Sequence, residues 1–585
     1  MTTPGSTALT AAALVLAAIT TIVIGAYGGR FARTTSDFLV ASRTVGPRWN
    51  AAAISGEYLS AASFLGVAGL VAKYGADALW YPVGFTAGYL GVLLFVAAPL
   101  RRSGAYTVPD FAEFRLSSRR ARQTAMLVVV LVCVLYLIPQ FQGAGLTLNI
   151  LLGVPVWVGA VAVGAIVVIN VVGGGMRSIT FVQAFQYWLK LTAIGVPALA
   201  LLVVFFADRQ PLGDPAGPRV EVATTVDVTT DTVLRVPETA GLSITGSLDG
   251  NPVTNAGFPT AGEYTVGAGS TIHLQAGAAT PVVAGAPATG EEWLATGGGL
   301  GGPHPLYQVY SIIVATFLGT MGLPHVLVRF YTNPDGRTAR RTAVTVIALL
   351  GLFYLFPLLL GVFARLYVPQ LLITGTADAA VLLLPSAAVG GIGGQLLAAL
   401  VAAGAIAAFL ATSSGLLVSI AGALSTDVLP GRVRDFRIAA VIGGVIPVAL
   451  SLAASSLELS RTVGLVFAVA ASTLCPLLVL GIWWRGLTPA GAIAGLVVGA
   501  SSSVGATSLA IAGVVGEEWL GGWLAVIIGY PAAVTVPLAF ATMIAVSLMT
   551  RRQIPGDLSR TFARMHVPER MGMGVERLPD QPRDS

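Results

Sequence analysis

The 585-residue chain is 55% hydrophobic and only 10% charged, and its mean hydropathy is +0.81. Soluble domains carry about 25% charged residues, so this composition excludes a soluble protein and indicates a chain that crosses a bilayer many times. The net charge of +6 is better explained by membrane topology than by nucleic-acid binding, because basic residues gather in short cytoplasmic loops.

The first apolar run, 8–26, has no Lys or Arg before it and no convincing cleavage site of small residues. This favours a spanning helix over a cleaved signal peptide. A hydrocarbon core about 30 Å thick needs roughly 20 apolar residues for each helix, and a window of that length predicts thirteen transmembrane helices. They are expected near 8–27, 50–72, 78–99, 124–150, 154–173, 180–206, 306–330, 342–367, 392–424, 436–456, 462–484, 489–514 and 522–548.

The arginines determine the expected orientation. If the N-terminus is outside, most basic residues fall on the cytoplasmic side, including Arg101, Arg102, Arg340 and Arg341, as the positive-inside bias requires. We therefore expect a multi-pass protein of the cell (inner or plasma) membrane with a cytoplasmic C-terminus. The expected divisions are helices 1–6 in 1–206, an insert at 207–303, helices 7–13 in 304–550 and a cytoplasmic tail at 551–585.

The insert at 207–303 is rich in Thr, Gly, Ala, Val and Pro and contains short β-like runs at 232–236, 242–247 and 271–275. Frequent glycine weakens each strand. The segment is therefore expected outside the membrane, either as a small β-domain or as an ordered loop with few strands. We also expect it to be dispensable for basic transport, because a conduction core closes without it.

Two expected helices are interrupted by polar or helix-breaking residues. The second carries Ser55, Gly56, Glu57, Tyr58, Ser60 and Ser63 in its middle, and the seventh carries Gly319, Thr320, Gly322, Pro324 and His325. They lie five spans apart and run in opposite directions, as corresponding helices of an inverted repeat do. Unwound backbone at such breaks offers carbonyl and amide groups to an ion or substrate. The sequence therefore predicts a substrate site between the two breaks.

Several long segments resemble the sodium/solute symporter family, and more closely its cation/acetate (monocarboxylate) branch. They read SDFLVASRTVG from Ser36, AISGEYLSAASFLGVAGL from Ala53, GAYTVPDFAEFRLSSR from Gly104, YLIPQFQGAGLTLNILLG from Tyr136 and LGTMGLPHVLVRFYTNPDGRTARR from Leu318. The resemblance implies an all-α membrane protein with a LeuT-like core of two inverted five-helix repeats, expected in 48–206 and 304–485. It also implies thirteen spans with an external N-terminus. The insert departs from that core.

The resemblance further implies a sodium site. A sodium ion is served by about five or six carbonyl, hydroxyl or carboxylate oxygens. Carried over residue by residue, the family pattern gives backbone carbonyls of Gly56 and Leu59 and three positions on the ninth span. Those positions are Ala408, Ala411 and Thr412.

This chain departs from the sodium pattern at two places. On the ninth span only Thr412 keeps a side-chain hydroxyl, and Ser413 or Ser414 could substitute for the missing one after a small rotation of the helix. On the sixth span Gln183 stands where the family has an acidic residue. At least one strong ligand is therefore missing. The sequence favours sodium as the coupling ion on the resemblance, with a proton as the alternative.

Two ionisable residues are expected deep in the membrane, where charge is costly enough to indicate function. Glu57 is expected to bind the cation, carry a proton or cap the helix break. Lys190 lies about ten residues into the sixth span, near the midplane at 1.5 Å per residue. It is expected to pair with a substrate carboxylate or with Glu57, or to replace a cation by reversible protonation. The alternative without a functional role is that the Lys190 side chain snorkels to the membrane interface.

The remaining candidate residues surround the same cavity. Tyr136, Gln140 and Gln142 of the fourth span are substrate candidates through the resemblance, and His325 is a candidate proton relay or a structural residue near the inner gate. The predicted substrate-binding set is Glu57, Ser60, Ser63, Tyr136, Gln140, Lys190 and Gly322, with Gln183 and His325 in coupling or gating.

These residues predict a secondary active symporter and not an enzyme. The expected substrate is a small monocarboxylate such as acetate, pyruvate or propionate, moved with a cation and without a bound cofactor. A passive channel or a sensor on the same scaffold is the second hypothesis, although the tail at 551–585 is short for a signalling domain. The chain has no nucleotide-binding loop and no recurring catalytic grouping of His, Asp and Ser.

Overall fold

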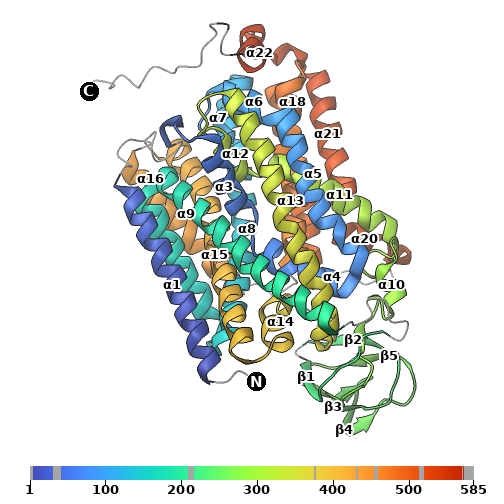
Figure 1. The fold of residues 1–585 in the computed structure, drawn as a ribbon. Coiled ribbons are helices and arrows are strands. Elements are labelled where there is room, and N and C mark those ends of the chain that lie inside the picture. The colour runs from blue at the N-terminus through green and yellow to red at the C-terminus, as the bar shows by residue number, and fades with distance from the viewer. Residues whose placement is uncertain are drawn as a thin grey trace.

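The computed structural model describes residues 4–30, 41–208, 217–228, 230–373, 377–429, 432–453, 459–512, 519–568 and 571. It is a bundle of long helices with one small sheet at one end (Figure 1). Helix α1 (Pro4–Gly29) begins at the end that carries the sheet, and α22 (Leu558–His566) lies at the opposite end. The expected tail beyond Met571, and residues 36–40 of the first resembling segment, lie outside the described residues.

The part of the bundle before the insert contains the first broken helix. Its elements are η1 (Ala41–Arg43), α3 (Pro47–Tyr58), η2 (Ala62–Gly66), α4 (Val67–Tyr74), η3 (Gly75–Leu79), α5 (Trp80–Gly91), η4 (Val92–Val96), α6 (Ala97–Ser103), α7 (Val108–Leu116), α8 (Arg119–Leu152) and α9 (Val156–Asp208).

The part after the insert contains the second broken helix. Its elements are α11 (Pro305–Gly322), α12 (Pro324–Phe330), α13 (Gly336–Tyr367), η5 (Pro369–Leu372), α14 (Ala380–Ala388), α15 (Gly391–Asp427), α16 (Val433–Ala453), α17 (Leu459–Ser472), α18 (Leu474–Trp483), α19 (Pro489–Ala512), η6 (Trp519–Gly522), α20 (Trp523–Gly529), α21 (Ala532–Met549), η7 (Arg551–Gln553) and α22.

Ten helices of the described chain are long and apolar enough to span a membrane, or up to eleven when the bent pair α11 and α12 is one span. Two of them, Ala62–Ser103 with 42 residues and Val156–Ala207 with 52 residues, each cover more than one expected span. Neither is one straight helix, because Gly75 (φ 60°, ψ −127°) interrupts the first and Gly175 (φ 55°, ψ −155°) kinks the second. The number thirteen therefore stays a prediction.

Helix α15 lies at the centre of the bundle, where it packs against α9, α8, α1 and α3. Its middle, from Val401 to Ala423, is buried throughout and consists mostly of Ala, Gly, Ser and Leu. Small residues let helix backbones approach closely in a membrane. This close packing brings α9 and the first broken helix against the same stretch of α15.

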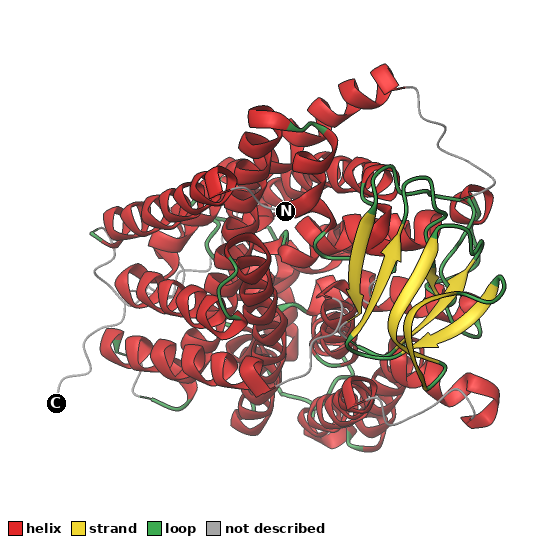
Figure 2. Ribbon diagram, turned by 90° about the horizontal axis from the view of Figure 1, so that it is seen from below, coloured by secondary structure: helices red, strands yellow, loops and turns green. Residues whose placement is uncertain are grey.

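The insert folds as a seven-stranded antiparallel sheet with strand order β1-β6-β3-β5-β2-β7, and β4 pairs with β3. The strands are β1 (Thr224–Val228), β2 (Thr232–Val236), β3 (Leu242–Leu248), β4 (Asn251–Gly257), β5 (Gly262–Val266), β6 (Ser270–Leu274) and β7 (Val282–Val283). Each of the three β-like runs of the sequence coincides with one of these strands. Leu234, Ile244, Val266 and Ile272 are fully buried in the core of the sheet, which lies to one side of the bundle in the view along it (Figure 2).

A docking segment, residues 287–299, attaches the sheet to the bundle. It includes α10 (Gly290–Leu294), whose Trp293 Nε1 donates to the Val71 carbonyl of α4 at 2.8 Å. Arg365 of α13 donates to the Pro287 carbonyl at 3.0 Å, and Asp77 accepts from the Gly299 amide at 2.8 Å. The docking segment therefore contacts the helix half that follows the first break, which refines the expectation that the whole insert is dispensable.

Excising 219–279 and joining Pro218 to Thr280 through a short glycine linker should leave substrate uptake measurable. The Thr280 amide donates to the Pro218 carbonyl at 2.9 Å, so the two cut ends already lie together and the docking segment is kept. Uptake in proteoliposomes checks this result, with a second deletion that also removes 287–299 as the comparison. Loss of transport in the shorter deletion, in protein that still inserts and stays monodisperse, would show that the sheet itself is needed.

Candidate transport site between the two broken helices

The first helix break frees backbone carbonyls at the centre of the bundle. Helix α3 ends at Tyr58, and the Ser60 amide turns back to the Tyr58 carbonyl at 2.8 Å instead of continuing the helical ladder. The carbonyl of Gly56 therefore loses its usual partner four residues on. Buried carbonyls must find another donor, and the neighbouring helices supply one for each.

Lys190 of α9 supplies the donor for two of these carbonyls. Its ammonium group hydrogen bonds to the carbonyl oxygens of Gly56 and Leu59, the latter at 2.6 Å, and the side chain is 0% exposed. Snorkelling to the interface does not occur here, because the ammonium ends in the helix break. The side-chain nitrogen of Lys190 thus occupies the position that the resemblance assigns to a cation.

Some of the remaining expected ligands of the cation already have hydrogen-bond partners, and others do not. Thr412 of α15 donates its hydroxyl to the Glu57 carbonyl at 2.6 Å, and Gln183 of α9 donates its amide to the Ala411 carbonyl at 2.7 Å. Ala408 is buried without a side-chain oxygen. The hydroxyls of Ser413 and Ser414 are buried and have no hydrogen-bond partner among the described residues.

Glu57 forms a buried ion pair with Arg329 of α12. Arg329 Nε lies 2.7 Å from Glu57 Oε2, and the two side chains are 0% and 1% exposed. The guanidinium also donates to the Thr180 hydroxyl at 2.7 Å and to the Gln183 side-chain oxygen. The ion pair therefore links the two broken helices to α9, and Lys190 does not form an ion pair with Glu57.

The space around the Glu57 carboxylate is filled by α15. A Cβ atom added to Gly415 would lie 1.8 Å from Glu57 Oε1, so only glycine leaves room for the carboxylate at this position. Oε1 itself has no hydrogen-bond partner among the described residues. Packing of this kind fixes the carboxylate against Arg329.

The second helix break lies between α11 and α12, which meet at Leu323 with a bend of 44°. Pro324 follows the break and has no amide hydrogen to continue the ladder. Tyr58 joins the two breaks, because its hydroxyl lies 2.7 Å from the Thr320 hydroxyl. A Cβ atom on Gly322 would lie 2.4 Å from the Ala470 carbonyl, so this predicted substrate residue packs closely against α17.

Aromatic and polar side chains of α8 and the second break face one another. The Tyr136 and His325 rings are 5.5 Å apart, edge to face, and Ser60 is buried beside the first break. Gln140 follows Tyr136 by four residues, on the same face of α8. The side-chain amide of Gln140 and both ring nitrogens of His325 are buried without hydrogen-bond partners among the described residues, a feature that calls for a polar ligand or water.

Two other predicted residues have structural partners. Ser63 hydrogen bonds to the Tyr354 hydroxyl of α13 at 2.9 Å, and Gln142 donates to the Ser451 carbonyl of α16 at 3.2 Å. Both side chains therefore hold helices together in this structure.

The Sodium:solute symporter family model matches residues 38–208 and 264–499, which is more than half of the chain. The chain belongs to this family. Most of the sheet lies in the stretch that the match leaves out, whereas the docking segment lies inside it.

Two relatives of this symporter match over nearly their whole lengths. One, from Bacillus subtilis (strain 168), is named uncharacterized symporter YwcA and is 30% identical over 95% of this chain and 97% of its own. The other, from Corynebacterium glutamicum, is named monocarboxylic acid transporter and is 29% identical over 98% of this chain and 97% of its own. The chain is therefore a membrane-bound solute symporter and not an enzyme.

Solved transporter structures share the fold of this family member. A Na⁺-coupled sialic acid symporter in a substrate-bound, outward-open state matches with a TM-score of 0.58 at 14% identity, over 92% of this chain and 98% of that chain. Mhp1, a nucleobase-cation-symport-1 family transporter in a closed conformation, matches with a TM-score of 0.50 at 14% identity, over 90% of this chain and 98% of that one. At such identities the likeness concerns the fold alone, which the symporter shares with these two transporters.

The residue that sequence reasoning left without a role in this symporter is Arg329. It stands one helical turn after His325, but its partner Glu57 is 272 residues away in the chain. The need for a positive charge beside Glu57 was the sequence signal that could have identified Arg329. Glu57 is an acidic residue deep within a span, and a buried carboxylate needs a cationic partner of similar depth.

Proposed function

We propose that this symporter imports a small monocarboxylate together with a proton, and that the Lys190 ammonium acts in place of a bound sodium ion. The observation that carries the proposal is the pair of hydrogen bonds from Lys190 to the carbonyls of Gly56 and Leu59. A lysine can release and regain its proton during a transport cycle. A proton at Lys190 then does the work that sodium binding does at the corresponding place in the family pattern.

The engaged oxygens support this choice over sodium, which the sequence alone favoured. A sodium ion at the break would have to displace a buried ammonium from two carbonyls and free Thr412 and the Ala411 carbonyl from their own partners. Two like charges within about 4 Å in a buried site also repel each other strongly. The loss of the second hydroxyl and of the acidic residue, at Ala411 and Gln183, fits a site that no longer needs sodium ligands.

The substrate class is supported by the relative named monocarboxylic acid transporter and by the unpartnered donors beside Tyr136. A carboxylate accepts hydrogen bonds only, so the Gln140 amide and a His325 ring N–H are suitable partners for it. The short apolar part of such a substrate fits the aromatic surroundings, where the centroids of the Phe467 and Tyr136 rings are 6.1 Å apart. The proposed substrate is therefore an anion of a few carbon atoms, such as acetate, pyruvate or propionate.

The transport cycle follows from the two breaks. The protonated Lys190 and the bound carboxylate close the halves of the broken helices around the site, and opening on the other side releases the carboxylate and the proton of Lys190. The proton travels with the anion, so each cycle moves no net charge.

We place the N-terminus and the sheet outside and the arginine-rich end, opposite the sheet, in the cytoplasm, because most Lys and Arg residues then lie inside.

Counterflow in proteoliposomes tests the substrate class. Vesicles loaded with unlabelled pyruvate, acetate or propionate should transiently accumulate the same labelled acid above its outside concentration, which a passive channel does not do. Protein-free vesicles correct for diffusion of the neutral acids. Counterflow with sugars or amino acids, and with none of these carboxylates, would reject the proposed substrate.

Replacing Gln140 by leucine should raise the KM for the carboxylate by about 10- to 100-fold, because one hydrogen bond to a charged group contributes roughly 1.5–3 kcal/mol. The maximal rate should change little. Initial uptake rates over a range of substrate concentrations measure this effect. The matched control is Gln142→Leu on the same helix, whose side chain bonds to α16. Equal KM values in the two variants would remove Gln140 from the site.

A further inference from the structure

A groove at the arginine-rich end of the bundle lies between α3, α13 and η4, away from the transport site. Its volume is about 860 Å³. Its apolar part includes Leu93, Leu94 and Val344, and the last two are 51% and 55% exposed. Apolar side chains that are so exposed on membrane-spanning helices face the hydrocarbon of the bilayer. The groove therefore opens toward lipid along one side.

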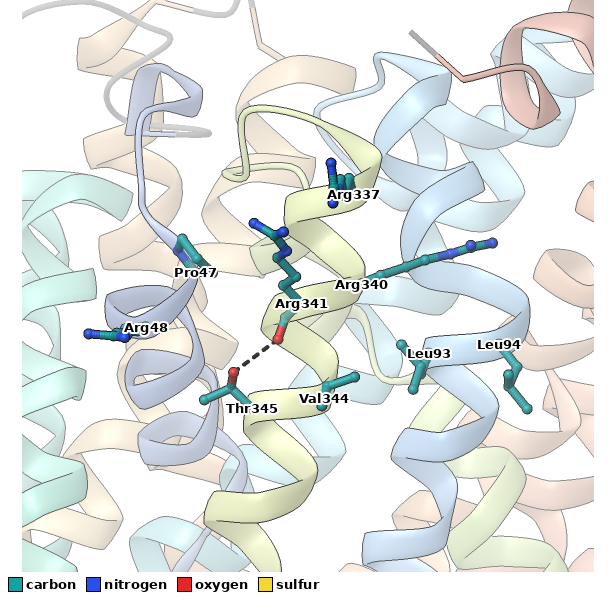
Figure 3. Close-up of a pocket in the computed structure, with 9 residues that line it drawn as sticks. All are labelled: Pro47, Arg48, Leu93, Leu94, Arg337, Arg340, Arg341, Val344 and Thr345. Carbon is teal, nitrogen blue, oxygen red and sulfur yellow. Dashed lines mark hydrogen bonds between the residues drawn. The ribbon is translucent and has the colours of Figure 1, made fainter. Parts of the chain in front are cut away.

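Four arginines form the polar part of the groove. Arg48 comes from the first turn of α3, and Arg337, Arg340 and Arg341 come from the first two turns of α13. Figure 3 shows Arg340 reaching across toward Leu93 and Leu94, Arg341 rising toward Pro47 and Arg337 standing at the end of the helix. All four side chains are exposed.

These arginines differ from others at the same end of the bundle. Arg101 donates to the carbonyls of Asn333 and Pro334, and Arg122 forms ion pairs with Asp427 and Glu113. No such bond joins the four side chains of the groove to any residue that the structure describes. The described residues that line the groove include no acidic side chain either. The positive-inside bias explains why arginines occur at this end, but not why unpaired ones surround a groove that opens toward lipid.

We propose that the groove binds the headgroup of an anionic phospholipid. The guanidinium groups match phosphate oxygens in charge and geometry, and the apolar side along Leu94 and Val344 accommodates the first part of an acyl chain. Basic pockets between helices on the cytoplasmic side are suited to anionic headgroups. A soluble phosphate or an acidic peptide would use the arginines but not the lipid-facing apolar surface. The proposal is independent of the substrate and of the coupling ion.

The site also has a mechanical consequence. Helix α3 ends at the first break and carries Gly56 and Glu57, while α13 packs beside it. Arg341 of α13 rises toward Pro47, at the start of α3 (Figure 3), so a headgroup held by Arg341 lies against the cytoplasmic ends of both helices. Bound lipid thereby restrains the inner half of the first broken helix.

Lipid binding to the purified full-length protein in neutral detergent tests the proposal. The variant Arg337→Gln/Arg340→Gln/Arg341→Gln should bind phosphatidylglycerol at least about tenfold more weakly than the unchanged protein, as native mass spectrometry measures it. Phosphatidylcholine should bind weakly to both. The matched control is Arg119→Gln/Arg120→Gln, which removes exposed arginines of the same end that do not line the groove. This control should keep its phosphatidylglycerol affinity.

Three outcomes would overturn the proposal. They are equal phosphatidylglycerol affinity in the groove variant and the control, equal affinity for phosphatidylcholine, and complete displacement of the lipid by millimolar inorganic phosphate, which would indicate a site for free anions. The variant Arg337→Lys/Arg340→Lys/Arg341→Lys keeps the charge and should retain most of the binding. A thermal unfolding midpoint close to that of the unchanged protein checks that each variant is folded.

Discussion

Replacing Lys190 by methionine should abolish accumulation driven by a proton gradient. Methionine has a similar length but carries no charge, so the carbonyls of Gly56 and Leu59 lose the ammonium that bonds to them. The site then lacks the group that takes up and releases the proton. Uptake of labelled substrate into proteoliposomes with an imposed inward proton gradient measures this loss, which should be at least about 100-fold relative to the unchanged protein.

Lys190→Arg separates the charge of this residue from its proton exchange. Arginine keeps the positive charge and stays protonated in proteins, so this variant should fold and insert but should not use the proton gradient. Lys73→Arg, at the only other lysine of the chain, is the control and should accumulate substrate normally. Full accumulation by Lys190→Arg under a proton gradient would refute a proton-transfer role for Lys190.

Replacing Arg329 by methionine should cause the largest loss of stability among single substitutions in the site. The Glu57 carboxylate would stay buried without its ion-pair partner, which costs about 3–5 kcal/mol. Thermal unfolding in detergent should show a clearly lower midpoint for Arg329→Met than for the unchanged protein. Transport by this variant should fall as well, because the ion pair joins the two broken helices.

The double variant Glu57→Gln/Arg329→Met distinguishes an ion pair from simple packing. Removing the carboxylate as well should recover a good part of the lost stability, since neither member of the ion pair is then left without its partner. Glu57→Gln alone should be milder than Arg329→Met, because Arg329 keeps its bonds to Thr180 and Gln183. If the double variant is no more stable than Arg329→Met, the ion pair is not the source of the effect.

Local sequence patterns predicted the parts of the fold that depend on local chemistry. Polar residues in an apolar helix and a proline in another predicted the two breaks, and β-branched runs predicted three strands of the insert. Lys190, expected well inside a span, is fully buried in the bundle. These features depend on a few neighbouring residues, so one sequence is enough to find them.

Contacts between distant segments were not predictable in the same way. The bond of Gln183 to the Ala411 carbonyl joins residues 228 positions apart, and periodicity within one helix does not reveal such a partner. Helix bounds alone do not give the number of spans either, because α9 includes a non-helical kink at Gly175, between two expected spans. The insert was expected to be separable as a whole, whereas Trp293 and Asp77 attach its last part to the bundle.

The central claim is that a proton at Lys190 replaces sodium. The most direct test measures uptake of the strongest acid among the accepted substrates, since it diffuses least through lipid, into proteoliposomes with an inward proton gradient and no sodium. Protein-free liposomes give the diffusion background. We predict accumulation above equilibrium with the proton gradient alone and none with a sodium gradient alone. Accumulation that requires sodium and is indifferent to the proton gradient would contradict this claim.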